Sequence, residues 1–175
     1  MTQHKPLIPP TAANIDMKLA EHATGVSYDA LSADTVHRIA TFVADTLSVG
    51  MAGSRVPEAQ TLHRTLAATD SGPAATVWGT GQALSAPNAI MANAFNVHCQ
   101  EYDCVHEGAV VHAMATLLPV LMAEVEQQHH AGHGVSGQAL CTAIAAGIDV
   151  ACTLGLAAKQ AMQFFRPATA GGFGA

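Results

Sequence analysis

The stretch LSADTVHRIATFVADTLSVGMAGS, residues 31–54, decides the fold because it has a complete helix signature. Ser32 is a suitable N-cap, and Asp34 falls in the first turn, where the positive end of the helix dipole favours an acidic residue. The apolar stripe at helical spacing consists of Ile39, Phe42, Val43 and Leu47. Gly50 and Gly53 are expected to loosen the end of this helix.

Similar patterns outward from this stretch predict further helices. They cover about 12–24, 58–67, 86–99, 112–128 and 136–162, with Ser136 as a second N-cap. The run AATVWGTG, 74–81, has strand character, and FFRPATAGGFGA, 164–175, reads as a glycine-rich turn of the kind that opens a new helix. We expect an all-α, helical bundle-like domain over 12–175, with at most one short β segment, preceded by an extended arm over 1–11.

The composition is apolar for a chain of this length. Of the 175 residues, 50% are hydrophobic and 11% charged, against roughly 25% charged in an ordinary soluble domain. So little charge predicts that part of the surface is covered by another subunit or domain. The formal net charge of −6, with seven scattered Lys and Arg residues, argues against a nucleic-acid partner.

The cysteines and the long apolar segment indicate where in the cell the protein is expected to lie. The four cysteines form no CxxC pair, and the N-terminal residues have no signal-peptide pattern, so reduced thiols and a cytoplasmic location are expected. The segment 139–158 has the length of a membrane span. Asp149 in its middle would be costly in lipid, so we expect a buried helix and no membrane contact.

The stretch NVHCQEYDCVHEGAVVHA, 96–113, gathers most of the chemistry. Its possible metal ligands fit no common zinc spacing, since HExxH and CxxC are both lacking, so we expect no metal. An acid–base pocket and a set of side chains that merely satisfy one another remain equally open from composition alone. His106 and His112 could exchange a proton near neutral pH, and His112 would begin a helix whose free N–H groups suit an anion. The second histidine group, HHAGH at 129–133, reads as a solvated loop.

Together with 31–54 and ATVWGTG, the stretches NAIMANAFNVHCQEYDCVHEGAVVHA and SGQALCTAIAAGIDVACTLGLA resemble the MmgE/PrpD family, in the family's order and spacing from about residue 19 to 175. The resemblance implies a large helical domain with a smaller α+β lid domain, usually as a homodimer. It also implies a site between the domains that works without metal or other cofactor. Family members act on small di- and tricarboxylates by proton abstraction next to a carboxylate, with loss of water or carbon dioxide, or by epimerisation.

The resemblance also implies site residues. When the family motif HALDFDDTHEGAVVHPS is laid on this chain, its first aspartate falls on Glu101 and its closing histidine on His112. Asp103 and His106 lie beside them, and these four are the expected catalytic residues. The family motif GFHPT falls on FFRPAT, so Arg166 with Thr169, together with His98, is expected to bind substrate.

The chain departs from the family pattern at several points. Cys104 and Val105 replace an aspartate and a threonine, and Arg166 replaces a titratable histidine with a permanent cation that can clamp a carboxylate. The substrate, or even the reaction, can therefore differ from those of the named members.

Because the chain is shorter than members of this family, two functions remain open. Family members are more than twice as long, so the lid domain is expected on a second chain or in a missing part. The first possibility is a carboxylate lyase or isomerase that needs that lid for activity. The alternative is a non-catalytic helical module that binds a partner or an organic acid without turnover.

Overall fold

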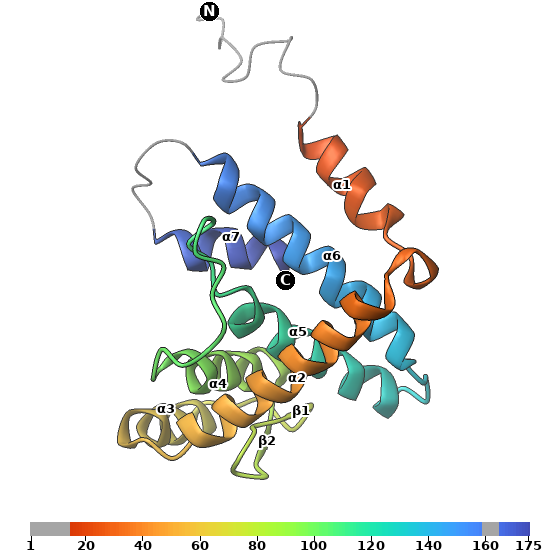
Figure 1. Cartoon of the computed structure of the whole chain (residues 1–175). Helices are drawn as coiled ribbons and strands as arrows, with labels where there is room; N and C mark the ends of the chain where they lie inside the picture. The colour runs from red at the N-terminus through yellow and green to blue at the C-terminus, as the bar shows by residue number, and fades with distance from the viewer. Residues whose placement is uncertain (1–14, 159–164) are drawn as a thin grey trace, which may run out of the picture.

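The computed structural model describes residues 15–158 and 165–175, and helices dominate it (Figure 1). They are α1 Ile15–Gly25, the short 3₁₀ helix η1 Tyr28–Ala30, α2 Ala33–Gly53, α3 Pro57–Ala68, α4 Ala86–His98, α5 Ala113–His130, α6 Gly137–Ala157 and α7 Arg166–Gly174. Strands β1 Ala75–Thr76 and β2 Ala83–Leu84 pair antiparallel in one small hairpin. The predicted all-α class is confirmed.

Local capping accounts for the helix starts that the sequence indicated. The backbone N–H of Thr35 donates to Ser32 Oγ at 3.1 Å, and that of Ala139 donates to Ser136 Oγ at the same distance. Both predicted N-caps are therefore confirmed. The arm over 1–11 and the expected helix start at 12–14 lie outside the described residues, as does 159–162, the end of the helix predicted over 136–162. Within the described part, that helix ends at Ala157.

The C-terminal stretch corrects one expectation, because α7 takes the place of a glycine-rich turn. Pro167 lies in its first turn, where a missing N–H costs no hydrogen bond. Gly171 packs against Thr116, and Gly174 lies against the backbone of Gly147 in α6. Close packing against α5 and α6 thus holds a helix that propensity alone would not favour.

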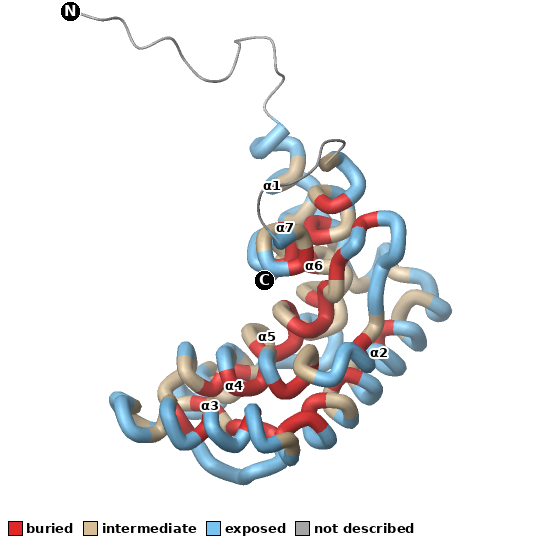
Figure 2. The backbone as a smooth tube through the Cα atoms, turned by 90° about the vertical axis from the view of Figure 1, so that its left-hand side faces the viewer, coloured by how far each residue is buried: buried red, intermediate tan, exposed pale blue. Residues whose placement is uncertain are grey.

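Helix α5 is the centre of the fold, since it contacts α2, α4, α6, α7 and β1. Figure 2 shows buried backbone running along α4 and α5, with exposed residues on the outer faces. The main core cluster gathers side chains from four helices and from the residues after β1: Ile39, Trp78, Val97, Met114, Ala115, Leu117, Leu118 and Ile144. The amino end of α5 is therefore anchored in the core.

The end of α2 is tightly packed, contrary to expectation. Gly50 and Gly53 are both buried inside the helix and face α4. A Cβ at Gly53 would overlap the backbone oxygen of Asn96. These glycines allow two helix backbones to approach, so their role is packing and not fraying.

Helix α6 is long and apolar enough to cross a membrane, on the grounds of length and composition alone. Only one of its faces is buried, through Ile144, Gly147, Val150, Ala151 and Gly155, against neighbouring helices. The helix that was expected to be buried is thus buried along one face only. Its Asp149 is exposed, and His22 of α1 lies 3.0 Å from the carboxylate.

The contact between α2 and α4 predicts the effect of one added methyl group. Gly53→Ala should lower the free energy of unfolding by about 1–3 kcal/mol, because the new Cβ must displace the backbone at Asn96. Gly172→Ala in α7 is the control, since a Cβ there meets nothing within 4 Å. Urea unfolding followed by circular dichroism measures both variants. A Gly53→Ala protein as stable as the Gly172→Ala protein would contradict this account of the contact.

Candidate functional site

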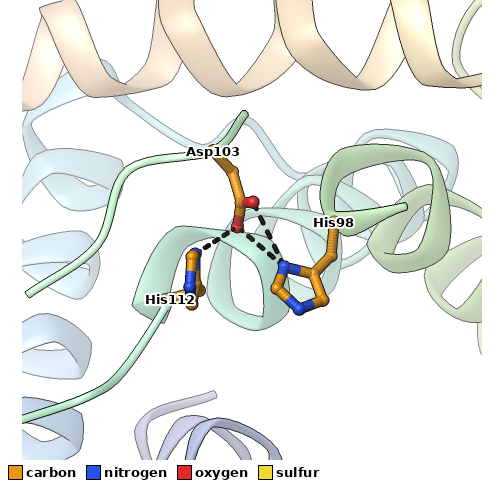
Figure 3. Close-up of side chains that lie close together, drawn as sticks. All are labelled: His98, Asp103 and His112. Carbon is orange, nitrogen blue, oxygen red and sulfur yellow. Dashed lines mark hydrogen bonds and ion pairs between the residues drawn. The ribbon is translucent and has the colours of Figure 1, made fainter. Parts of the chain in front are cut away.

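A buried carboxylate joins two imidazoles where α4 ends and α5 begins (Figure 3). His98 is the last residue of α4, His112 is the N-cap of α5, and Asp103 lies in the connection between them. His98 Nδ1 lies 3.1 and 3.3 Å from the two Asp103 oxygens, and His112 Nδ1 lies 3.1 Å from Oδ2. The connection thus brings together three side chains that are spread over fifteen residues of sequence.

The hydrogen-bond pattern assigns the roles of the ring nitrogens. The Asp103 side chain has 0% exposure, and as a carboxylate it can only accept hydrogen bonds. Each Nδ1 therefore carries a hydrogen and donates it to Asp103. In each ring, Nε2 is the nitrogen directed away from Asp103, and Figure 3 shows this plainly for His98. A neutral imidazole held in this way presents a basic Nε2 lone pair.

The two rings also touch each other. Their centroids are 4.7 Å apart with the planes inclined at 62°, an edge-to-face arrangement. The His98 side chain remains 32% exposed and that of His112 18%, in contrast to Asp103. The imidazoles are therefore reachable while the group that orients them is sealed off.

A cavity of about 320 Å³ opens beside these rings, between α4, α5 and the start of α7. Its wall consists of Ala94, Phe95, His98, Cys99, His112, Ala115, Thr116, Phe165, Pro167 and Ala168. Both imidazoles line the cavity, whereas Asp103, which binds their Nδ1 atoms, does not. The cavity and the three polar residues form one site.

A tight turn delivers His112 to this position. His106 and Val111 exchange backbone hydrogen bonds, and Ala109 N–H donates to His106 Nδ1 at 3.0 Å. Within this turn, Val110 has φ 54°, which is a strained conformation for a β-branched residue. Buried Ala109 and Val111 on either side hold it there.

The structure brings together three of the residues predicted from sequence, namely His98, Asp103 and His112. His106 is exposed and faces its own turn, so its ring serves the loop backbone. Glu101 is also exposed, with φ 50°, in the turn that follows α4. Neither side chain lines the cavity. Whether they act on a substrate stays a prediction.

The predicted residues of α7 lie beside the cavity without forming its wall. Arg166 begins the helix, while its neighbours Phe165 and Pro167 line the cavity. The Thr169 hydroxyl donates to the Phe165 backbone oxygen at 3.1 Å, within its own helix turn. A substrate contact by Arg166 therefore needs its long side chain to turn toward the cavity.

The cysteine next to Asp103 is an unreactive part of the packing. Cys104 is half-buried against the main core cluster. Burial, with a smaller contribution from the nearby Asp103 carboxylate, raises the pKa of the Cys104 thiol to about 11. It therefore stays neutral at physiological pH and is a poor nucleophile or metal ligand.

Among the described residues, His98, Asp103 and His112 are the one group of His, Cys, Asp or Glu side chains close enough to surround a metal ion. One ligand atom from each lies within 4.8 Å of the others. Nδ1 of each histidine is at hydrogen-bond distance from Asp103, so an ion bound through Nδ1 and this carboxylate would have to replace those hydrogen bonds. That the site works without metal remains a prediction.

Sequence reasoning missed the apolar wall. Phe95 could have been found, because it precedes His98 by three residues and so shares its helix face. Thr116 follows His112 by four residues in the same way. Phe165 and Ala168 lie in the FFRPAT motif, which pointed to Arg166 and Thr169, and the packing of α7 against α5 brings these neighbours to the cavity wall instead.

An all-α domain in which one buried carboxylate orients two imidazoles beside a cavity defines a class of small-molecule site suited to acid–base chemistry. The chain belongs to the MmgE/PrpD family, since residues 17–175 match the MmgE/PrpD N-terminal domain. This is a family of dehydratases and decarboxylases that act on carboxylates.

One curated relative gives a more particular comparison. The chain is 25% identical over 146 residues to the cis-aconitate decarboxylase-like protein oryM of Aspergillus oryzae (strain ATCC 42149 / RIB 40). The match covers 82% of this chain and 30% of that protein. The chain therefore spans about a third of the length of the relative that it matches.

The shared carboxylate predicts a change of tautomer on substitution. In Asp103→Asn one carboxylate oxygen becomes an NH₂ donor, so an Nδ1–H that faces it has no acceptor there. The ring concerned should move its hydrogen to Nε2 and accept from the amide at Nδ1. Long-range ¹H–¹⁵N NMR spectra report this directly. The free energy of unfolding should fall by about 1–3 kcal/mol, because hydrogen bonds to a buried charge are replaced by weaker neutral ones.

The control is Asp34→Asn, which affects an exposed ion pair with Arg38. It should leave the spectra of His98 and His112 unchanged. Unaltered ring nitrogens in Asp103→Asn would show that Asp103 does not set the tautomers.

Proposed function

We propose that this chain carries the acid–base half of a metal-independent lyase or isomerase that acts on a small carboxylic acid. One observation carries the proposal: Asp103 binds Nδ1 of both His98 and His112, and both of these rings line one cavity. A carboxylate behind an imidazole fixes its tautomer and stabilises the imidazolium that forms when Nε2 takes a proton.

His112 is the proton-transferring residue in this proposal. In dehydration or epimerisation, Nε2 removes the proton on the carbon next to the carboxylate, and the electron pair spreads into that carboxylate. In dehydration the proton then returns to the leaving hydroxyl, which departs as water. In epimerisation an acid from the lid domain would supply the new proton on the other face of the carbon. In decarboxylation, the electron pair left by departing carbon dioxide takes up a proton from His112 in its imidazolium form, which has first been protonated at Nε2 by solvent.

His98 and the helix end bind the charged part of the substrate. His112 is the N-cap of α5, where the helix dipole favours an anion. His98, in contact with His112, can donate to the same carboxylate when it is protonated. Both groups act on one side of the substrate.

A full reaction also needs a fixed cation near the developing enolate-like charge. No Lys or Arg among the described residues lines the cavity, although Arg166 begins α7 next to it. We propose that a lid domain, on a second chain or in the rest of a longer protein, supplies the missing cations and closes the site. A homodimer is part of the same proposal, since 11% charged residues cover little of a surface.

Deuterium exchange tests the base without requiring the complete reaction. The chain should catalyse exchange of the hydrogen next to a carboxylate in 2-methylcitrate or a related acid in D₂O, as measured by ¹H NMR. Dehydration or decarboxylation should be faster when the lid domain is added. His112→Asn should slow the exchange by about 10²–10⁴-fold, the usual contribution of a general base.

His37→Asn is the matched control, because His37 is exposed on α2. Its exchange rate should equal that of the unaltered chain, and a chelator should change neither rate. If His112→Asn exchanges as fast as His37→Asn, the assignment of the base is wrong. If acids bind but no hydrogen exchanges, the chain is a binding module, and the catalytic proposal fails.

A further inference from the structure

The cavity beside His98 and His112 is apolar on every other side. Phe95 from α4, Ala115 from α5, and Phe165, Pro167 and Ala168 at the start of α7 form most of its wall. Phe165 is 68% exposed and Phe95 37%. Two phenyl rings at the edge of one cavity are apolar surface that a ligand would remove from water.

The two remaining polar side chains of the wall are already engaged. The Thr116 hydroxyl donates to the Ala113 backbone oxygen at 3.1 Å. The Cys99 thiol is directed to the backbone oxygens of Asn96 and Gly53, at 3.5 and 3.8 Å. Burial raises the pKa of the Cys99 thiol, so it carries no charge near neutrality. Polar donors for a ligand are therefore confined to the imidazole edge.

This distribution constrains the shape of the ligand. One carboxylate of the ligand has hydrogen-bond partners at His98 and His112. A second carboxylate placed against phenyl, alanine and proline side chains would give up its bound water and find no donor in return. A hydrocarbon chain loses nothing there and gains from burial. The volume of about 320 Å³ holds on the order of ten non-hydrogen atoms, at the ~30 Å³ that a water occupies in the liquid.

We propose that the acid bound at this site carries an alkyl arm several carbons long, which occupies the cavity between α4, α5 and α7. The substrate class is an alkyl-substituted di- or tricarboxylic acid, with its charged groups at the imidazole edge and toward the open side. The inference rests on the proposed function for the carboxylate anchor, but binding of the arm does not depend on turnover.

A homologous series of ligands tests the arm. Succinate and its methyl-, butyl- and hexyl-substituted derivatives are titrated into the purified chain by isothermal titration calorimetry, with His98 and His112 followed by NMR. Affinity should rise about fourfold for each methylene that enters the cavity and then level off. Equal affinity along the series, or no saturable binding of the hexyl compound, would overturn the proposal.

A variant that fills the cavity locates the effect. Ala168→Leu is suitable because Ala168 is exposed on α7 and lines the cavity. It should remove most of the gain that butyl and hexyl arms give over succinate, so that the affinities along the series become nearly equal. Ala40→Leu, at an exposed position of α2, is the matched control and should keep the full gain. A full gain in both variants would mean that the arm binds elsewhere, against the proposal.

Turnover separates this inference from the proposed function. Exchange or loss of carbon dioxide from unsubstituted acids, with no preference for alkylated ones, would support the function and reject the arm. Binding that strengthens with chain length, without any exchange, would support the arm and reject catalysis.

Discussion

The charge on Asp103 is the constraint on which the site depends. A buried carboxylate is stable only when donors replace its water, and here the two donors come from the last residue of α4 and the N-cap of α5. The same hydrogen bonds that satisfy the carboxylate therefore fix both rings. These hydrogen bonds also join the end of α4 to the start of α5. The connection therefore cannot take up its conformation without placing the two rings.

The surroundings of this polar cluster explain why it can be well ordered. Immediately after His112, α5 enters the main core through Met114, Ala115, Leu117 and Leu118. Helix α4 is pressed against α2 by the close approach at Gly53. The imidazoles thus stand on two helices that the core holds in place, and only the connecting turn, with its strained Val110, lies outside that support.

The parts of the structure that sequence predicted are those set by local interactions. Ser32 and Ser136 cap helices through hydrogen bonds to residues three positions later, so their roles could be read from sequence. Asp103 and His112 were indicated by the resemblance to the MmgE/PrpD motif, since composition alone left their role open. Gly53 was misjudged because its role depends on α4, and the apolar wall was missed because α7 reaches it from far along the chain.

His106 illustrates the same limit in the other direction. It has the residue type and the position expected of a catalytic group, yet its ring accepts a hydrogen bond from Ala109 within the turn. Composition cannot distinguish an imidazole that serves a loop from one that serves a ligand. Only the geometry around each ring does so.

The edge-to-face contact of His98 and His112 has a consequence for evolution as well as for chemistry. Each ring belongs to a different helix, so their separation of 4.7 Å measures how α4 lies against α5. A substitution deep in that helix interface, far from any ligand, would change the spacing of the two rings. The reactivity of this pocket can therefore be tuned from the hydrophobic core, without alteration of a single residue that a substrate touches.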